Sequence, residues 1–64
     1  MASFEIIERV GISTKSLTVA VQNAVNEANK EKKVAWFEVA EQRGRVTNEN
    51  EIEFQVTVKI GRKL

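Results

Sequence analysis

A strict two-residue alternation runs through residues 51–60, which read EIEFQVTVKI. Because successive side chains of a strand point to opposite faces, the apolar residues of this stretch share one face and the polar ones share the other. The pattern predicts a strand with one buried face. Its apolar row consists of Ile52, Phe54, Val56, Val58 and Ile60.

A second alternating stretch covers residues 34–46, and residues 47–50 between the two have the composition of a turn. The two stretches therefore predict a hairpin. A turn centred near residues 48 and 49 pairs Trp36 with Gly61, where we expect the missing side chain to leave open space beside the indole. In an unbroken register the apolar row shares its face with Phe37, Val39, Arg43 and Arg45, and the opposite face carries Trp36, Glu38, Gln42, Gln55 and Thr57, with Gln42 across from Gln55.

Upstream of the hairpin the sequence predicts one strand and one helix. Residues 4–12 are rich in Ile and Val and alternate loosely, which is typical of a strand. The hydroxyls of Ser13 to Ser16 suit a helix start, and lysines at 30, 32 and 33 suit the negative end of the helix dipole, which places the helix end near Lys32. One apolar stripe of helical period lies between them, formed by Leu17, Ala20, Val21, Ala24, Val25 and Ala28.

The element order β-α-β-β predicts an α+β fold in one domain, residues 1–64. We expect a three-stranded antiparallel sheet with one face covered by the helix and no second helix for the other face. A chain of 64 residues buries only about 60% of its unfolded surface, which makes a lone monomer marginal. With no Cys and no His, disulfides and the usual metal sites are missing, so we expect partner subunits to stabilise the fold.

Composition and charge argue against several classes of function. The net charge of +1 provides no strong field for nucleic acid or an anionic membrane, and no apolar run approaches the roughly 18 residues of a membrane span. Residues 1–5 lack the features of a signal peptide, so we expect a cytoplasmic protein. The element order and the lysines near residue 32 leave nucleic-acid binding as an alternative, although a single Trp is a poor stacking platform for bases.

We expect neither catalysis nor a bound metal. The common general bases and thiol nucleophiles are missing with His and Cys, and the glutamates show no spacing typical of paired acids. Glu49, Glu51 and Glu53 are interpreted as a solvated turn and strand edge rather than a metal site.

Trp36 and Gln55 are the candidate functional residues, because both are expected on the face that no helix covers. Two interpretations of Trp36 remain open: it fills a subunit interface, or it stacks on a planar aromatic ligand. The two side chains lie about 20 Å apart along the hairpin at 3.3–3.4 Å per residue. A small ligand that contacts both must therefore lie between two or more subunits.

Four sequence blocks resemble the dodecin family when they are taken together. They are Val10-Gly11 with Ser13, then residues 36–39 (WFEV), 41–44 (EQRG) and 54–61 (FQVTVKIG), and they span nearly the whole chain in order. The chain departs from the family at its end, where Gly61-Arg62-Lys63-Leu64 stands in place of Gly-Phe-Arg-Leu. A charge thus replaces an aromatic residue, and Lys63 replaces an arginine.

The resemblance implies a hollow homododecamer in which each sheet wraps around its helix and flavins stack between tryptophans of neighbouring subunits. Trp36 and Gln55 match the family's flavin-binding positions, which implies storage and quenching of FMN or riboflavin, with FAD and lumichrome as alternatives. Arg43 and Arg45 are candidates for the FMN phosphate; the other interpretation is that they meet solvent or an ion pair, such as Glu53 of a neighbouring chain. The alternative function is a dodecin-like scaffold without flavin, which binds coenzyme A or another phosphate ligand.

Overall fold

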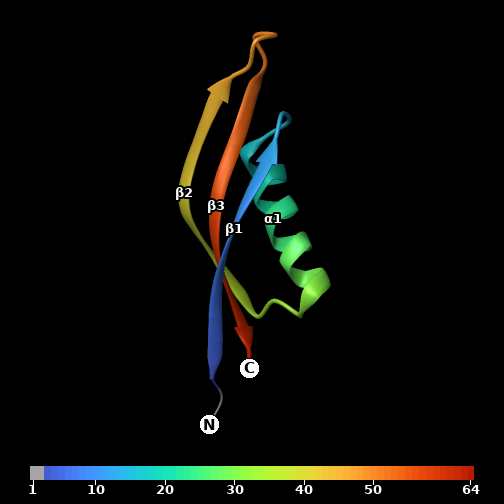
Figure 1. Ribbon diagram of the computed structural model, residues 1–64, viewed down its shortest axis with the longest axis vertical. Coiled ribbons are helices and arrows are strands. Elements are labelled where there is room, and N and C mark those ends of the chain that lie inside the picture. Colours follow the sequence, from blue (N-terminus) through green and yellow to red (C-terminus); the bar gives the residue numbers. More distant parts are fainter. Residues whose placement is uncertain (1–2) are drawn as a thin grey trace.

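The computed structural model describes residues 3–64 and has the element order β-α-β-β (Figure 1). Residues 1 and 2, part of the stretch in which we expect no targeting signal, lie outside the described residues. The three strands form one antiparallel sheet in the order β1-β3-β2, with the last strand in the middle, so the expected fold class is confirmed. The elements are β1 (Phe4–Ser13), α1 (Leu17–Glu31), β2 (Trp36–Val46) and β3 (Ile52–Lys63).

Helix α1 begins and ends where its sequence signals predict. The Ser16 hydroxyl accepts a hydrogen bond from the Val19 amide at 3.1 Å and so caps the first turn. At the other end the Lys32 amide donates to the Ala28 carbonyl at 3.2 Å. The Asn29 side-chain oxygen then accepts the Val34 amide at 2.8 Å, which directs the chain back towards the sheet.

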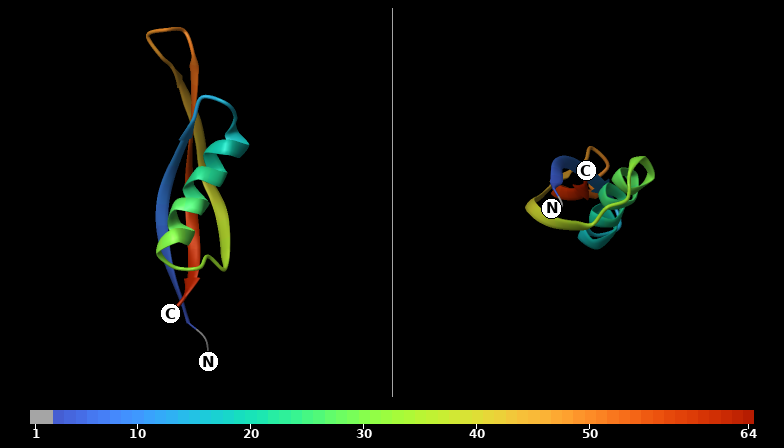
Figure 2. Two further views of the ribbon diagram at one scale, coloured as in Figure 1. Left: turned by 90° about the vertical axis from the view of Figure 1, so that its right-hand side faces the viewer. Right: turned by 90° about the horizontal axis from the view of Figure 1, so that it is seen from below.

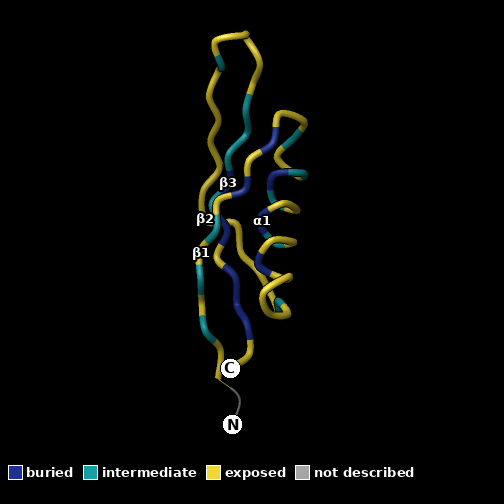
Figure 3. The backbone as a smooth tube through the Cα atoms, turned by 45° about the vertical axis from the view of Figure 1, so that its right-hand side comes forward, coloured by how far each residue is buried: buried dark blue, intermediate teal, exposed yellow. Residues whose placement is uncertain are grey.

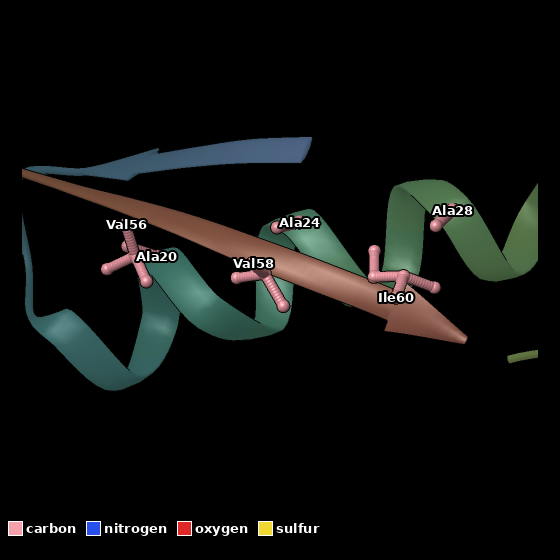
Figure 4. Packing of buried hydrophobic residues seen from close by; sticks show 6 residues of the cluster. All are labelled: Ala20, Ala24, Ala28, Val56, Val58 and Ile60. Carbon is pink, nitrogen blue, oxygen red and sulfur yellow. The ribbon is translucent and has the colours of Figure 1, made fainter. Parts of the chain in front are cut away.

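The core is a contact between small helix residues and the middle strand (Figure 4). Alanines spaced four apart form one side of the helix, and because their side chains are short, the helix can approach the strand closely. The apolar row predicted for the last strand meets them over its central part, whereas Ile52, near the hairpin tip, stays 55% exposed. The fully buried contact consists of Ala20, Ala24 and Ala28 against Val56, Val58 and Ile60.

The helix lies over β1 and β3 and hardly reaches β2, which stays exposed along its whole length (Figures 1 and 3). Phe37 and Val39 do share the face of the buried row, as predicted, because they pair with Ile60 and Val58. They are nevertheless 49% and 39% exposed. The helix therefore leaves uncovered one complete face of the sheet and also the helix-side face of β2.

The β2–β3 hairpin extends past the end of β1 and past the start of the helix (Figure 2, left). The pairing of β1 with β3 ends at Ser13 and Phe54, so only two strands continue to the tip. The turn lies at the predicted place but is one residue longer, because the loop spans residues 47–51. The Asn50 amide donates to the Thr47 carbonyl at 3.0 Å, and Asn50 has a φ of 62°. Asparagine tolerates this left-handed conformation better than most residues.

Arg62 closes the opposite end of the core with charge. Its side chain is 10% exposed, and its Nη2 lies 2.9 Å from a Glu5 carboxylate oxygen. Its Nη1 lies 3.5 Å from the Glu31 carboxylate, which also accepts Arg9 at 2.9 Å. Where the resemblance implies an aromatic residue, this chain therefore has an ion cluster that joins β1, β3 and the last turn of α1.

Gly11 is the point of closest approach between sheet and helix, and we predict that Gly11→Ala strongly destabilises the protein. A Cβ at this position would overlap the Ala20 carbonyl oxygen and lie 3.0 Å from the Ala24 Cβ. The obstacle is helix backbone, so we expect the free energy of unfolding to fall by about 3 kcal/mol, at the upper end for overpacking. Urea denaturation at fixed protein concentration measures the change.

The control for this experiment is Asn26→Ala, a substitution on the exposed side of α1. It should shift the free energy of unfolding by no more than about 0.5 kcal/mol. Equal midpoints for Gly11→Ala and Asn26→Ala would contradict the close helix–sheet contact.

Candidate functional site

Trp36 opens β2 and lies opposite Gly61, as the sequence predicts. The expected open space beside the indole is not there, because the indole itself occupies it: a Cβ at Gly61 would overlap the ring atoms Cε2, Nε1 and Cζ2. The ring of Phe4 lies nearby, with centroids 6.5 Å apart and planes tilted by 59°. The indole thus packs directly on the backbone of Gly61, and Trp36 as a whole remains 39% exposed.

A β-bulge at Ala40 changes which residues of β2 face the candidate site. Trp36 to Val39 pair in the predicted register, but from Glu41 onwards each residue pairs one position further along. One extra residue exchanges the two faces of a strand. The prediction that Arg43 and Arg45 lie on the helix side, with Gln42 on the other, is therefore wrong: Arg43 pairs with Gln55, Arg45 with Glu53, and Gln42 with Val56.

The bulge gathers all four predicted site residues on the uncovered face, at two separate ends. The aromatic end holds Trp36 beside Phe4 and Ile6, and the polar end holds Arg43, Arg45, Glu53 and Gln55. Gln55 precedes Gly61, the partner of Trp36, by six positions on β3, which corresponds to about 20 Å. Trp36 and Gln55 of one chain therefore share a face without sharing a pocket.

The polar end is organised around Glu53, a residue that the sequence placed only in a solvated turn or in a contact between chains. Arg45 Nε lies 2.9 Å and Nη2 3.4 Å from its two carboxylate oxygens, within the same chain. Gln55 Nε2 donates to the first of these oxygens at 3.0 Å. The cross-strand pairing of Arg45 with Glu53 would have been the signal, but a count from a turn of residues 47–50 misses it, because the loop also includes Glu51 and shifts the adjacent register by one residue.

The two arginines of the polar end differ in how tightly they are paired with a carboxylate. The hydrogen bonds from Arg45 and then Gln55 hold the pKa of Glu53 below its ordinary value, and the same Glu53 contact raises the pKa of Arg45. Glu53 is therefore ionised at neutral pH. Arg43 forms a weaker pair with the Glu41 carboxylate at 3.4 Å, because both side chains are largely exposed and solvent screens their charges. The Arg43 guanidinium can therefore bind another anion.

The site consists of the exposed ring of Trp36, which suits a planar ligand, and the amide of Gln55, which suits the polar edge of such a ligand. Two hollows of about 400 and 490 Å³ are lined by described residues, and neither includes Trp36 or Gln55. Within residues 3–64 no group of three acidic side chains could hold a metal ion. In the same range no helix is long and apolar enough to cross a membrane.

Comparison with known proteins identifies relatives that cover the whole chain. Residues 4–64 match the model of the dodecin family. A dodecin from Thermus thermophilus is 36% identical over 62 residues, which cover 95% of this chain and 90% of that protein. A crystal structure of a variant of the T. thermophilus dodecin has a TM-score of 0.90 at 34% identity, covering 100% of this chain and 96% of that one. Dodecin from Streptomyces coelicolor has a TM-score of 0.88 at 34% identity, covering 98% and 91%.

We predict that Gly61→Ala displaces the indole of Trp36 while the fold persists. The new methyl group would occupy the position of the ring, which lies at the exposed end of the sheet and can move outwards. Trp36 is the only tryptophan of the chain, so intrinsic fluorescence reports on it alone. We expect a red-shifted emission maximum and stronger quenching by iodide. An unchanged spectrum, with circular dichroism also unchanged, would contradict the placement of the indole over Gly61.

Proposed function

This chain belongs to the dodecin family, and from that premise we propose that it binds flavin and stores or sequesters it inside a shell assembled from copies of itself. The observation that carries the proposal is the position of Trp36. It is the only tryptophan, it lies on the face that the helix leaves open, and one side of its ring rests on Gly61. The exposed part of Trp36 is the proposed contact for a second planar ring.

Stacking is the interaction that we propose for Trp36. Aromatic pairs contribute about 0.5–1.5 kcal/mol beyond the area that they bury, and an electron-rich indole in contact with an excited flavin quenches it. Quenching protects the ligand and its surroundings from photochemistry, which suits storage rather than turnover. We propose binding without catalysis, because the chain has neither His nor Cys beside the proposed ligand.

Self-assembly is part of the proposal, because one chain cannot complete the site. The aromatic and polar ends of the open face lie about 20 Å apart, so a two-fold axis that packs two such faces together brings the Trp36 of one copy towards the Gln55 of the other. The face also exposes Phe4, Ile6, Val10 and Ile12, which such packing would cover. On the strength of the family resemblance we propose that this pairing builds a hollow homododecamer of single-domain subunits, and we keep the cytoplasm, expected from the sequence, as its proposed location.

The chemistry of the polar end supports a flavin as the ligand. The Gln55 amide provides both a donor and an acceptor, which complement the mixed pyrimidine edge of an isoalloxazine. Arg43, which is exposed and weakly paired, is the proposed contact for the phosphate of FMN, whereas Arg45 is already bound to Glu53. We therefore propose FMN or riboflavin as the ligand, with FAD and lumichrome sharing the same ring contacts.

Titration of riboflavin and FMN with the ligand-free assembled protein tests the proposal. We expect strong quenching of flavin fluorescence by the wild type and little or none by Trp36→Ala. Trp36→Phe keeps an aromatic ring but loses the electron-rich donor, so we expect weaker binding with incomplete quenching. Light scattering establishes that each variant retains the assembly size of the wild type.

An assembled wild type that quenches neither flavin would contradict flavin storage. Trp36 would then serve a subunit interface, and the protein would be a dodecin-like scaffold. In that case coenzyme A, which offers phosphates without an isoalloxazine ring, is the ligand to titrate next, followed by calorimetry.

We predict that Arg43→Ala separates FMN from riboflavin. Loss of one charge-assisted phosphate contact should weaken FMN binding about tenfold and leave riboflavin, which has no phosphate, within about twofold of the wild type. The matched control is Lys15→Ala, which removes an exposed positive charge near the helix start. Equal losses for the two flavins would contradict a phosphate contact and assign Arg43 to the structure of the hairpin.

A further inference from the structure

We propose that Glu53 is a positioning residue that sets the orientation of the Gln55 amide, and that Arg45 holds Glu53 in place. The proposal rests on the proposed flavin-binding function and adds to it the origin of ligand selectivity. Neither residue needs to touch the ligand. The basis is the chain of hydrogen bonds from Arg45 through Glu53 to Gln55 at the polar end of the open face.

The orientation of the amide follows from what a carboxylate can do. A glutamine side chain ends in two groups of nearly equal shape, an acceptor oxygen and a donor nitrogen, so its shape alone does not decide which of them faces a ligand. An ionised carboxylate only accepts hydrogen bonds, so Glu53 selects the arrangement in which Nε2 of Gln55 faces it, at 3.0 Å. The Gln55 Oε1 and the second hydrogen on Nε2 are left for other partners.

Arg45 supplies the two conditions under which this selection works. Its hydrogen bonds keep the pKa of Glu53 low, so that the side chain remains an acceptor well below neutral pH. Two contacts to the two carboxylate oxygens, at 2.9 and 3.4 Å, also restrict rotation of the carboxylate. The side chain of Glu53 is only 18% exposed, whereas that of Arg45 is 61% exposed.

Arg45 is the charged group that contacts Glu53, which it faces directly across the hairpin. Further along the same face lie Arg43, opposite Gln55, and Glu41, opposite Thr57, and these two pair with each other at 3.4 Å. Strand β1 ends at Ser13, opposite Phe54, and the helix lies on the other face of the sheet. The state of the amide therefore depends on this one carboxylate and its arginine.

The consequence is selectivity for a ligand that presents an N–H group. With Nε2 bound to Glu53, the Oε1 of Gln55 is the acceptor available to the N3–H of an isoalloxazine. A flavin methylated at N3 cannot donate there and leaves Oε1 without a partner, which weakens its binding. Without Glu53 the amide can turn and offer its nitrogen to the flanking carbonyl oxygens instead, so the preference should shrink.

The test compares riboflavin with 3-methylriboflavin on the assembled wild type, Glu53→Ala and Glu51→Ala. We expect the wild type to prefer riboflavin by at least about tenfold. Glu53→Ala should bind riboflavin roughly 3- to 10-fold more weakly, because the amide is no longer held, and should lose most of the preference. Glu51→Ala removes an exposed carboxylate from the same hairpin and should match the wild type.

The ratio of the two affinities distinguishes positioning from a merely structural role. If Glu53→Ala weakens both flavins equally, or changes neither, the proposal is overturned while the proposed function stands. A wild type that binds the two flavins equally also overturns it, whereas a wild type that binds neither contradicts the proposed function itself. Should Glu53→Ala fail to assemble, Glu53→Leu, which keeps a side chain of similar size but has no acceptor oxygen, should show the same loss of preference.

Arg45→Ala provides a second readout, the pH dependence of the preference. Glu53 has a lowered pKa in the wild type, so it remains ionised, and the preference persists, as the pH falls through the ordinary glutamate value of about 4.3. Without Arg45 the pKa returns towards that value, Glu53 takes up a proton at higher pH, and the preference is lost earlier on acidification. Coincident pH profiles for wild type and Arg45→Ala would remove Arg45 from the proposal.

Discussion

The packing of three alanines of α1 against β3 is the contact on which the rest of the molecule depends. Because these side chains are short and Gly11 lacks one altogether, the helix lies almost on the sheet backbone. A single helix held so close covers β1 and β3 but not β2. Because the core is this narrow, the monomer leaves a large apolar surface exposed.

That exposed surface is also where the proposed function lies. One face of the sheet has an aromatic end at Trp36 and a polar end at Gln55, and their separation along the strands prevents a single chain from enclosing a small ligand. Assembly and ligand binding therefore draw on the same surface: packing of two such faces covers apolar residues that a marginal 64-residue fold needs to bury, and it also brings unlike ends together.

Two local features distinguish the two ends of this fold: a bulge in β2 and an ion cluster around Arg62. The bulge at Ala40 places Trp36 on the same face as Arg43, Arg45 and Gln55, and the pair of Arg45 with Glu53 gives the glutamine a defined partner. At the other end of the core, Arg62 forms ion pairs with Glu5 and Glu31. Charge thus joins the helix to the sheet at the position for which the sequence resemblance implies an aromatic residue.

The sequence by itself determined the four elements, a helix start within residues 13–16 and the buried row of β3, because caps and periodicities are local. It also predicted the pairing of Trp36 with Gly61, which holds because the bulge at Ala40 offsets a loop one residue longer than predicted. Family motifs added the expectation of flavin at Trp36 and Gln55. Only the tertiary structure decided that the helix leaves β2 uncovered, that the indole fills the space over Gly61, and that Arg45 meets Glu53 in its own chain. These features depend on the bulge and on the helix position. Both are set by how whole surfaces pack, and the alternation around Ala40 carries no sign of an extra residue.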